Sequence, residues 1–245
     1  KATPRTANNK LKVVRVLFQS AWRDGLLTDN PAAKVPTLKA AKSKRRPFSL
    51  PELRSVLKVA SQEWQGMILF ALYTGQRLKD IASLTWSNVD LEHNEIHFST
   101  SKTSRFQVIP LATALRRFVE EMPTSDDPRE PLFLNAYKIA TTHLHTGLLS
   151  REFSELLATA GLVKAQPATH EGSGKGRNSK RDNNDISFHS LRHTATSLLK
   201  NAGVSDAVAM DLVGHESAAV SASYTHIDDE AKRRAIAKLP DIMGF

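Results

Sequence analysis

The chain has 245 residues, of which 40% are hydrophobic, and it carries a formal net charge of +9. A chain of this length can bury one good core, or one core and a smaller second domain. It contains no cysteine, which excludes disulfides, thiolate catalysis and cysteine-based zinc sites. No apolar run is long enough to cross a membrane, and the basic N-terminus lacks the apolar run of a secretory signal, so we expect a cytoplasmic protein.

The positive charge is concentrated in the first part of the chain. Residues 1–47 hold twelve Lys or Arg and two acidic residues, a net charge of +10, whereas the remaining residues hold 22 basic and 23 acidic ones. A cationic segment beside a near-neutral domain suits a polyanionic partner, because binding releases condensed counterions. A solubilising surface explains the charge equally well, so charge alone does not assign a partner.

The N-terminal segment is predicted to form one amphipathic helix. Apolar residues recur at helical spacing over about 8–24, and Gly25 with the Asn30-Pro31 pair ends the pattern. One helix cannot bury a core alone, so we expect residues 1–35 to be the last part of a helical domain. Residues 36–47 are predicted to be a basic linker.

A second domain is predicted over residues 48–245. Ser49 and Glu52 form a capping-box pattern for a helix to about Ala60, and Gly75 is the natural stop of a nearly all-apolar helix at 64–74. A short helix at 78–84 follows. Short strands are predicted at 89–91, 95–99 and 106–109, which would form a small antiparallel sheet.

The rest of this domain is predicted to be helical apart from one insertion. Helices are expected at about 112–121, 148–160, 190–201, 205–213, 217–223 and 228–238. Residues 164–185 are rich in Gly, Ser, Lys, Arg and Asn, and we expect a flexible insertion there. The predicted fold class is therefore mostly α with a small antiparallel β-sheet (α+β).

A cluster of polar residues stands out in the last third of the chain. His189, Arg192 and His193 fall on one helix, where positions 189 and 192 share a face, as do 189 and 193. His215 follows Gly214 at a helix end, and Tyr224 lies on a short helical segment. Each of these residues taken alone is more often an ordinary core or surface group.

A zinc site is one alternative for this cluster. His189 and His193 have the i, i+4 spacing of a helical zinc pair, and His215 would be a third ligand. However, Ser190 stands where the zincin motif has a glutamate, and Arg192 would place a fixed cation in the metal site.

The ordered set of residues resembles the tyrosine recombinase (phage integrase) family. The pattern is His-x-x-Arg at 189–192, Gly-His at 214–215 and a tyrosine nine residues later, at 224. Upstream, Thr-Gly-Gln-Arg at 74–77 resembles the family's Thr-Gly-x-Arg box, with Asp80 at its acidic position, and Lys102 lies between two predicted strands, where the family has its lysine. The resemblance covers residues 8–238 and implies the integrase catalytic-domain fold, with residues 1–35 as the end of the core-binding domain. The main departure is the long basic insertion at 164–185.

The resemblance implies a site-specific recombinase that cuts and rejoins DNA through a 3′-phosphotyrosine. Arginines stabilise the pentacoordinate phosphate with their planar, permanently charged fork, and nearby cations favour the phenolate of a tyrosine nucleophile. The implied catalytic residues are the nucleophile Tyr224, the phosphate-binding Arg77 and Arg192, the general acid Lys102, and His189 and His215. Asp80 would orient Arg77, and His193 is interpreted as a packing residue behind the site. Neither a metal nor another cofactor is implied.

The implied partner is double-stranded DNA. The residues expected to contact it are Lys39, Lys42, Lys44, Arg45, Arg46 and Arg105. The resemblance also implies a homotetramer on DNA, with the C-terminal segment at 228–245 exchanged between protomers, in the cytoplasm at the nucleoid and away from membranes. Two further alternatives stay open: a type IB topoisomerase-like enzyme that religates the same strand, and a DNA-binding protein with an inactive site.

Overall fold

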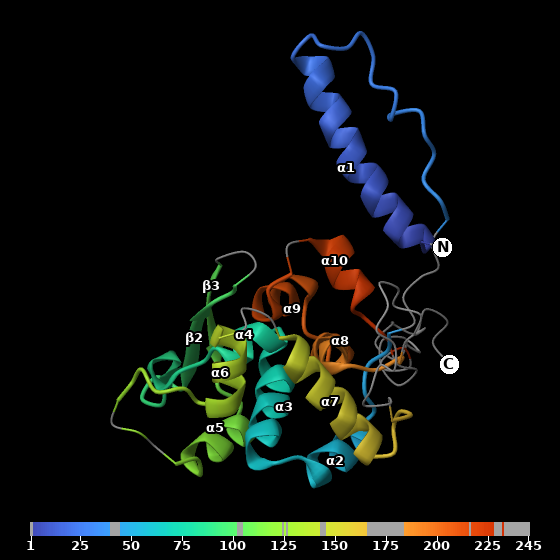
Figure 1. The fold of residues 1–245 in the computed structure, drawn as a ribbon. Helices are drawn as coiled ribbons and strands as arrows, with labels where there is room; N and C mark the ends of the chain where they lie inside the picture. Colours follow the sequence, from blue (N-terminus) through green and yellow to red (C-terminus); the bar gives the residue numbers. More distant parts are fainter. Residues whose placement is uncertain are drawn as a thin grey trace, which may run out of the picture. The chain divides into compact units, whose positions relative to one another are not determined.

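The computed structural model describes residues 2–39, 45–101, 105–123, 125, 127–142, 146–165, 184–215, 217–227 and 232. The chain divides into two compact units, Lys1–Lys44 and Arg45–Phe245 (Figure 1). The predicted helix at 228–238, except Lys232, and most of the predicted insertion at 164–185 lie outside the described residues. In the described part, no helix combines the length and apolar character needed to cross a membrane.

The N-terminal unit is built on one helix, α1 (Pro4–Arg23). It begins earlier than predicted, because the Thr3 side chain caps it and Pro4 fits its first turn. The following chain is bonded back to α1: Arg15 Nε donates to the Ala32 carbonyl at 3.0 Å, and Asn8 Nδ2 donates to the Leu38 carbonyl at 2.8 Å. No residue of α1 is buried. Side-chain-to-backbone hydrogen bonds therefore tie the following segment to α1.

The larger unit begins with three predicted helices, of which the first starts and the second ends at its predicted signal. In α2 (Leu50–Val59), Ser49 and Glu52 form the predicted capping box. The next helix, α3 (Gln62–Thr74), ends at Gly75, whose φ of 67° lies in the left-handed region that favours glycine. The third helix, α4 (Leu78–Ala82), is two residues shorter than predicted, and a 3-10 turn, η1 (Trp86–Asn88), follows.

The predicted antiparallel sheet is present with the order β1-β2-β3. Its strands are β1 (Val89–Asp90), β2 (Glu95–Ser99) and β3 (Phe106–Pro110). Ile96 pairs with Ile109 and both are buried, which fixes the register because a one-residue slip would expose them. The sheet therefore turns one apolar face to the core.

Six further helices complete the described part of this unit. The predicted ones are α5 (Thr113–Glu120), α7 (Gly147–Thr159), α8 (Phe188–Asn201), α9 (Asp206–Val213) and α10 (Ala218–Ser223). Helix α6 (Leu134–Thr142) was not predicted, and its buried residues are only Ala136 and Ala140. A helix that buries small side chains gives a weak apolar periodicity.

The core of the larger unit forms around α3 and α8, which lie side by side at its centre (Figure 1). An aromatic cluster holds the start of α8: the ring centroids of Phe153 and Phe188 are 5.2 Å apart, and those of Trp64 and Phe153 are 5.6 Å apart. Phe48 joins the cluster, and its backbone N–H donates to Thr194 Oγ1 at 2.9 Å. The fold is mostly helical with one small antiparallel sheet, as predicted, and α8 presents its polar residues from a fixed position.

Candidate active site

The Tyr224 hydroxyl lies within hydrogen-bond distance of His189 in the same chain. Tyr224 is the C-cap of α10, and its Oη is 2.8 Å from Nε2 of His189 on α8. In the tautomer protonated at Nδ1, His189 Nε2 accepts the phenolic hydrogen. A phenol and a group able to accept its proton are therefore paired within one chain.

The phenol ring of Tyr224 is held between two imidazoles. The His193 ring stacks on it with centroids 4.4 Å apart and an interplanar angle of 26°, and the His215 ring lies 4.7 Å from it at 35°. His193 is 8% exposed and His215 is 3% exposed. Both aromatic contacts restrict the orientation of the phenol ring. The interpretation of His193 as a packing residue thus acquires a specific partner, the Tyr224 ring.

The backbone around Tyr224 is also tied to α8. Ser197 Oγ donates to the Tyr224 carbonyl at 3.3 Å and accepts from the backbone N–H of His226 at 3.0 Å. Asn201 Nδ2 donates to the His226 carbonyl at 3.3 Å. One face of α8 therefore positions both the ring and the main chain of this segment.

Arg192 forms the buried floor of the site. Only 2% exposed, it donates from Nη1 to the carbonyls of Gly75 at 2.8 Å and Val213 at 2.7 Å, and from Nη2 to that of Gly214 at 3.1 Å. Burial and the nearby Arg77 lower its pKa to about 10, so it stays charged at neutral pH. Its Nε has no partner among the described residues. The guanidinium is fixed by backbone from two separate turns and retains a donor for another group.

Arg77 lies closer to the surface and has one carboxylate beside it. Its side chain is 27% exposed, and its Nη1 is 3.8 Å from Oδ2 of Asp80, whose side chain is fully buried. Oδ1 of Asp80 accepts from the backbone N–H of Ser101 at 2.8 Å. Asp80 thus connects Arg77 to the end of β2, immediately before Lys102. Lys102 itself lies outside the described residues.

Burial and neighbouring cations keep the histidines of the site neutral. Burial is the main cause of a lowered pKa of about 4 for His189, and His193, Arg45, Arg192 and Arg77 lower it further. The pKa of His193 is also lowered to about 4, and that of His215 to about 3, again chiefly by burial. At neutral pH all three rings are uncharged, so each has one nitrogen able to accept a proton.

Two glutamines missed by the sequence analysis hold the turn that carries His215. Gln76 Nε2 donates to the Val213 carbonyl at 3.2 Å, and Gln107 Nε2 donates to the Asp211 carbonyl at 3.0 Å. Gly214 has a φ of 76°, and a Cβ there would lie 2.9 Å from Gln107 Oε1. The only sequence signal for Gln76 was its place inside the Thr-Gly-x-Arg box. Both ring nitrogens of His215 are buried without a partner in the described part of the chain.

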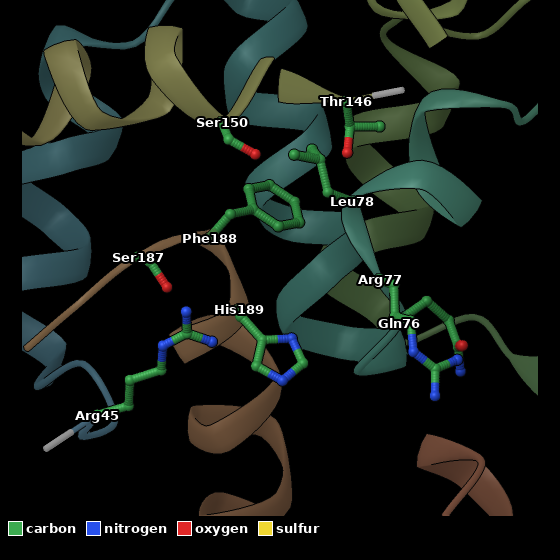
Figure 2. Close-up of a pocket in the computed structure, with 9 residues that line it drawn as sticks. All are labelled: Arg45, Gln76, Arg77, Leu78, Thr146, Ser150, Ser187, Phe188 and His189. Atoms are coloured by element: carbon green, nitrogen blue, oxygen red, sulfur yellow. The ribbon is translucent and has the colours of Figure 1, made fainter. Parts of the chain in front are cut away.

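A cavity of about 230 Å³ adjoins His189 and Arg77. Figure 2 shows the residues that line it, which are Arg45, Gln76, Arg77, Leu78, Thr146, Ser150, Ser187, Phe188 and His189. Arg45 was named from the sequence as a basic residue of the linker that is expected to contact DNA. Nothing in the sequence indicates that it lies next to His189.

The other predicted DNA-contacting residues are spread over different surroundings. Lys39 is exposed, whereas Lys42 and Lys44 lie outside the described residues. Arg46 forms a bidentate pair with Glu52 at 2.9 and 2.7 Å, and this pair lowers the pKa of Glu52 to about 2. Arg105 is paired with Asp211. Their contacts with DNA stay predictions.

The three histidines do not form the zinc site that was considered. The rings of His189, His193 and His215 surround the Tyr224 ring, at centroid distances of 5.3, 4.4 and 4.7 Å. Among the described residues, no three His, Cys, Asp or Glu side chains are grouped as possible metal ligands. That interpretation of these residues was wrong, because a phenol ring occupies the space between them.

Comparison with known proteins gives one family. The sequence model of the phage integrase family matches residues 46–231. Among curated proteins, the tyrosine recombinase XerC of Roseiflexus sp. (strain RS-1) is 23% identical over 96% of this chain and 72% of its own length.

Solved structures show the same fold. A lambda integrase (75–356) dimer bound to a COC′ core site has a TM-score of 0.62 and 21% identity, over 87% of this chain and 73% of that one. A lambda integrase tetramer bound to a Holliday junction has a TM-score of 0.59 and 22% identity, over 87% of this chain and 59% of that one.

Proposed function

The chain belongs to the phage integrase family, and from this premise we propose that it catalyses site-specific DNA recombination with Tyr224 as the nucleophile. The observation that carries the proposal is the 2.8 Å contact between Tyr224 Oη and His189 Nε2, formed beside the buried guanidinium of Arg192. A phenol that is paired with an imidazole and surrounded by cations is suited to attack a phosphodiester.

The proposed reaction is an exchange of one phosphoester bond for another. Tyr224 Oη attacks the phosphorus, its proton passes to His189 Nε2, and the bond from phosphorus to the 5′ oxygen breaks. A 3′-phosphotyrosine and a 5′-hydroxyl result, the latter protonated by Lys102 in this proposal. Attack by the 5′-hydroxyl of another strand reverses the step and releases the tyrosine. The ester bond is conserved throughout, so the cycle needs neither ATP nor a metal.

The two arginines are proposed to neutralise the transition state from different sides. Nε of Arg192 is the donor left over after its other nitrogens have bonded to carbonyls. Arg77, more exposed, is proposed to contact a second non-bridging oxygen, with Asp80 fixing its position. His215, with its unpartnered nitrogens next to the Tyr224 ring, supplies a further hydrogen bond to the phosphate.

The same proposal includes the partners. The substrate is double-stranded DNA, since the related lambda integrase structures hold a core site and a Holliday junction. We extend the proposal to a homotetramer on DNA in which residues 228–245 pass to a neighbouring protomer, and to action at the nucleoid in the cytoplasm. The N-terminal unit is proposed to belong to a core-binding domain, joined to the catalytic domain by the basic segment at 36–47.

Covalent trapping tests the nucleophile and selects the target sequence in one experiment. A pool of nicked duplexes, randomised on both sides of the nick, is incubated with the protein, because the short strand released at the nick cannot reverse the reaction. Adducts that survive denaturing electrophoresis are recovered and sequenced, and the attached peptide is identified by mass spectrometry. We expect the phosphate on Tyr224.

The chain provides its own matched controls, since it has three tyrosines. Tyr224→Phe should abolish the adduct, whereas Tyr73→Phe and Tyr137→Phe should leave it unchanged. An adduct that persists in Tyr224→Phe would exclude this nucleophile. Exchange of strands between two selected sites, rather than relaxation of supercoils alone, separates a recombinase from a topoisomerase-like enzyme.

A further inference from the structure

The cavity beside His189 is lined mainly by cationic and hydrogen-bonding groups from four segments of the larger unit (Figure 2). We propose that it binds a second phosphate of the DNA backbone, next to the one that Tyr224 attacks, and that Arg45 is its principal ligand. This inference rests on the proposed function, and it adds a substrate contact that the catalytic set does not include.

The charge of the lining favours an anion. Arg45 and Arg77 stand on two sides of the cavity in Figure 2, and none of the nine lining residues is acidic. The nearest carboxylate partner of Arg77 is Asp80, which is buried and already accepts from Ser101 N. Neighbouring Arg46 has Glu52 as its counter-ion, a residue that does not line the cavity. A guanidinium is well suited to a phosphate because two of its N–H groups match two phosphate oxygens.

A buried hydroxyl and two helix starts add donors to the same cavity. Ser187 Oγ is buried and has no hydrogen-bond partner within the described residues. Ser187 is the N-cap of α8, a helix of 14 residues, and Thr146 is the N-cap of α7, a helix of 13 residues. The first backbone N–H groups of a helix lack intrahelical acceptors and favour an anion. Figure 2 shows the Arg45 guanidinium directed toward Ser187 and His189.

The cavity is distinct from the place where the attacked phosphate would lie. Its lining contains neither Arg192, His215 nor Tyr224, and it shares only Arg77 and His189 with the catalytic set. Its volume of about 230 Å³ lies below the roughly 300–1,000 Å³ of pockets for drug-sized ligands, which suits a phosphate group and part of a sugar rather than a whole nucleotide. Leu78 and Phe188 provide an apolar wall for the sugar.

Occupation of the cavity would also act on the proposed base. Arg45 and Arg77 are among the cations that lower the pKa of His189. A phosphate between them offsets this charge, so the imidazole becomes a stronger base once DNA is in place. Substrate binding and proton acceptance are thereby linked through Arg45.

Equilibrium binding is the first test, in the Tyr224→Phe background, so that cleavage does not interfere. The probe is a duplex recovered by covalent trapping. We expect Arg45→Ala to weaken binding about tenfold and to reduce the slope of log affinity against log salt by about 0.9, the value for one lost phosphate contact. Arg54→Ala, which removes an exposed arginine of α2, should change neither quantity. Unchanged affinity and slope in Arg45→Ala would overturn the inference.

Replacement of single phosphates locates the contact. Each phosphate near the nick is replaced in turn by a neutral methylphosphonate. At one position other than the attacked phosphate, we expect the wild-type Arg45 protein to lose about tenfold in affinity and Arg45→Ala to lose nothing further. Coupling confined to the attacked phosphate, or no coupling at any position, contradicts the proposal.

A competition experiment separates backbone phosphate from free phosphate. At equal ionic strength, inorganic phosphate should displace the duplex no better than chloride does. Selective displacement by phosphate that disappears in Arg45→Ala would make the cavity a site for the free anion instead. Should the wild-type protein form no covalent adduct with any duplex, the proposed function fails; an adduct that is insensitive to Arg45 refutes this inference alone.

Discussion

The floor and the edge of the site hold their charged groups in different ways. We call the buried Arg192 and His215 the floor, and Arg45, Arg77 and His189 the edge. Arg192 is fixed by three backbone carbonyls and is 2% exposed, whereas Arg77 has one carboxylate at 3.8 Å and a side chain that is 27% exposed. The floor can therefore change its position only together with the fold, while the side chains of the edge can adjust to the DNA.

Arg192→Lys gives the largest expected effect. An ammonium cannot reach the carbonyls of Gly75, Val213 and Gly214 together, so buried acceptors are left without donors. We expect adduct formation to slow about a thousandfold and the free energy of unfolding to fall by about 3 kcal/mol. Single-turnover trapping and urea denaturation measure the two quantities. A loss of activity without a loss of stability would remove the distinction between floor and edge.

Arg77→Ala should affect activity far more than stability. Loss of one cation that stabilises the transition state slows adduct formation about a hundredfold. The free energy of unfolding should change by only about 1 kcal/mol, because Asp80 keeps its bond from Ser101 N. The same two assays apply, with Asp80→Asn as the companion variant. If Arg77→Ala destabilises the protein as much as Arg192→Lys does, the edge is as rigid as the floor.

His193→Ala should slow adduct formation by about tenfold, since an aromatic contact contributes about 0.5–1.5 kcal/mol. His193→Phe keeps a ring against Tyr224 and should recover most of the rate. Recovery by Phe identifies stacking as the contribution of His193, and both variants should bind DNA as the wild type does. Failure of Phe to recover the rate would indicate that the imidazole itself takes part.

Acid should destabilise the protein through His189 and His215. The folded-state pKa values of about 4 for His189 and about 3 for His215 lie below the ordinary value of 6.5. Between these values the unfolded chain binds more protons, so the free energy of unfolding falls as pH decreases from about 6.5.

We expect a contribution on the order of 1 kcal/mol from each histidine. In His215→Gln, the free energy of unfolding should fall less than in the wild type between about pH 6.5 and pH 3. In His189→Gln, the smaller fall should be confined to the range from about pH 6.5 to pH 4. Urea denaturation across this pH range provides the measurement. Identical profiles for the wild type and both variants would contradict the neutral state of these rings.

Much of the fold followed from local signals in the sequence. The start of α2 was predicted because the side chains of Ser49 and Glu52 each accept from the other's backbone N–H, and the end of α3 because Gly75 adopts a positive φ. The missed helix α6 buries only alanines, and its start is held by Glu63, which accepts from the Ala136 backbone N–H. That bond joins residues far apart in the chain, and no local pattern predicts it.

The sequence named the residues of the candidate site but not their contacts. The ordered motif names Tyr224, His189 and Arg192 together, and the structure brings these three side chains side by side. The contact of His193 with the Tyr224 ring and the place of Arg45 beside His189 depend on the packing of distant segments. The spacing of residues along the chain carries no information about such neighbours.

The clasp of three carbonyls around Arg192 has a consequence for the descent of this protein. The turn after α3 and the turn after α9 are joined by hydrogen bonds from Arg192, the same side chain that would bind the substrate phosphate. A lineage that abandons strand exchange can discard its nucleophile at little cost to folding. Loss of this guanidinium would cost stability, so relatives that have lost recombinase activity should keep the arginine more often than the tyrosine.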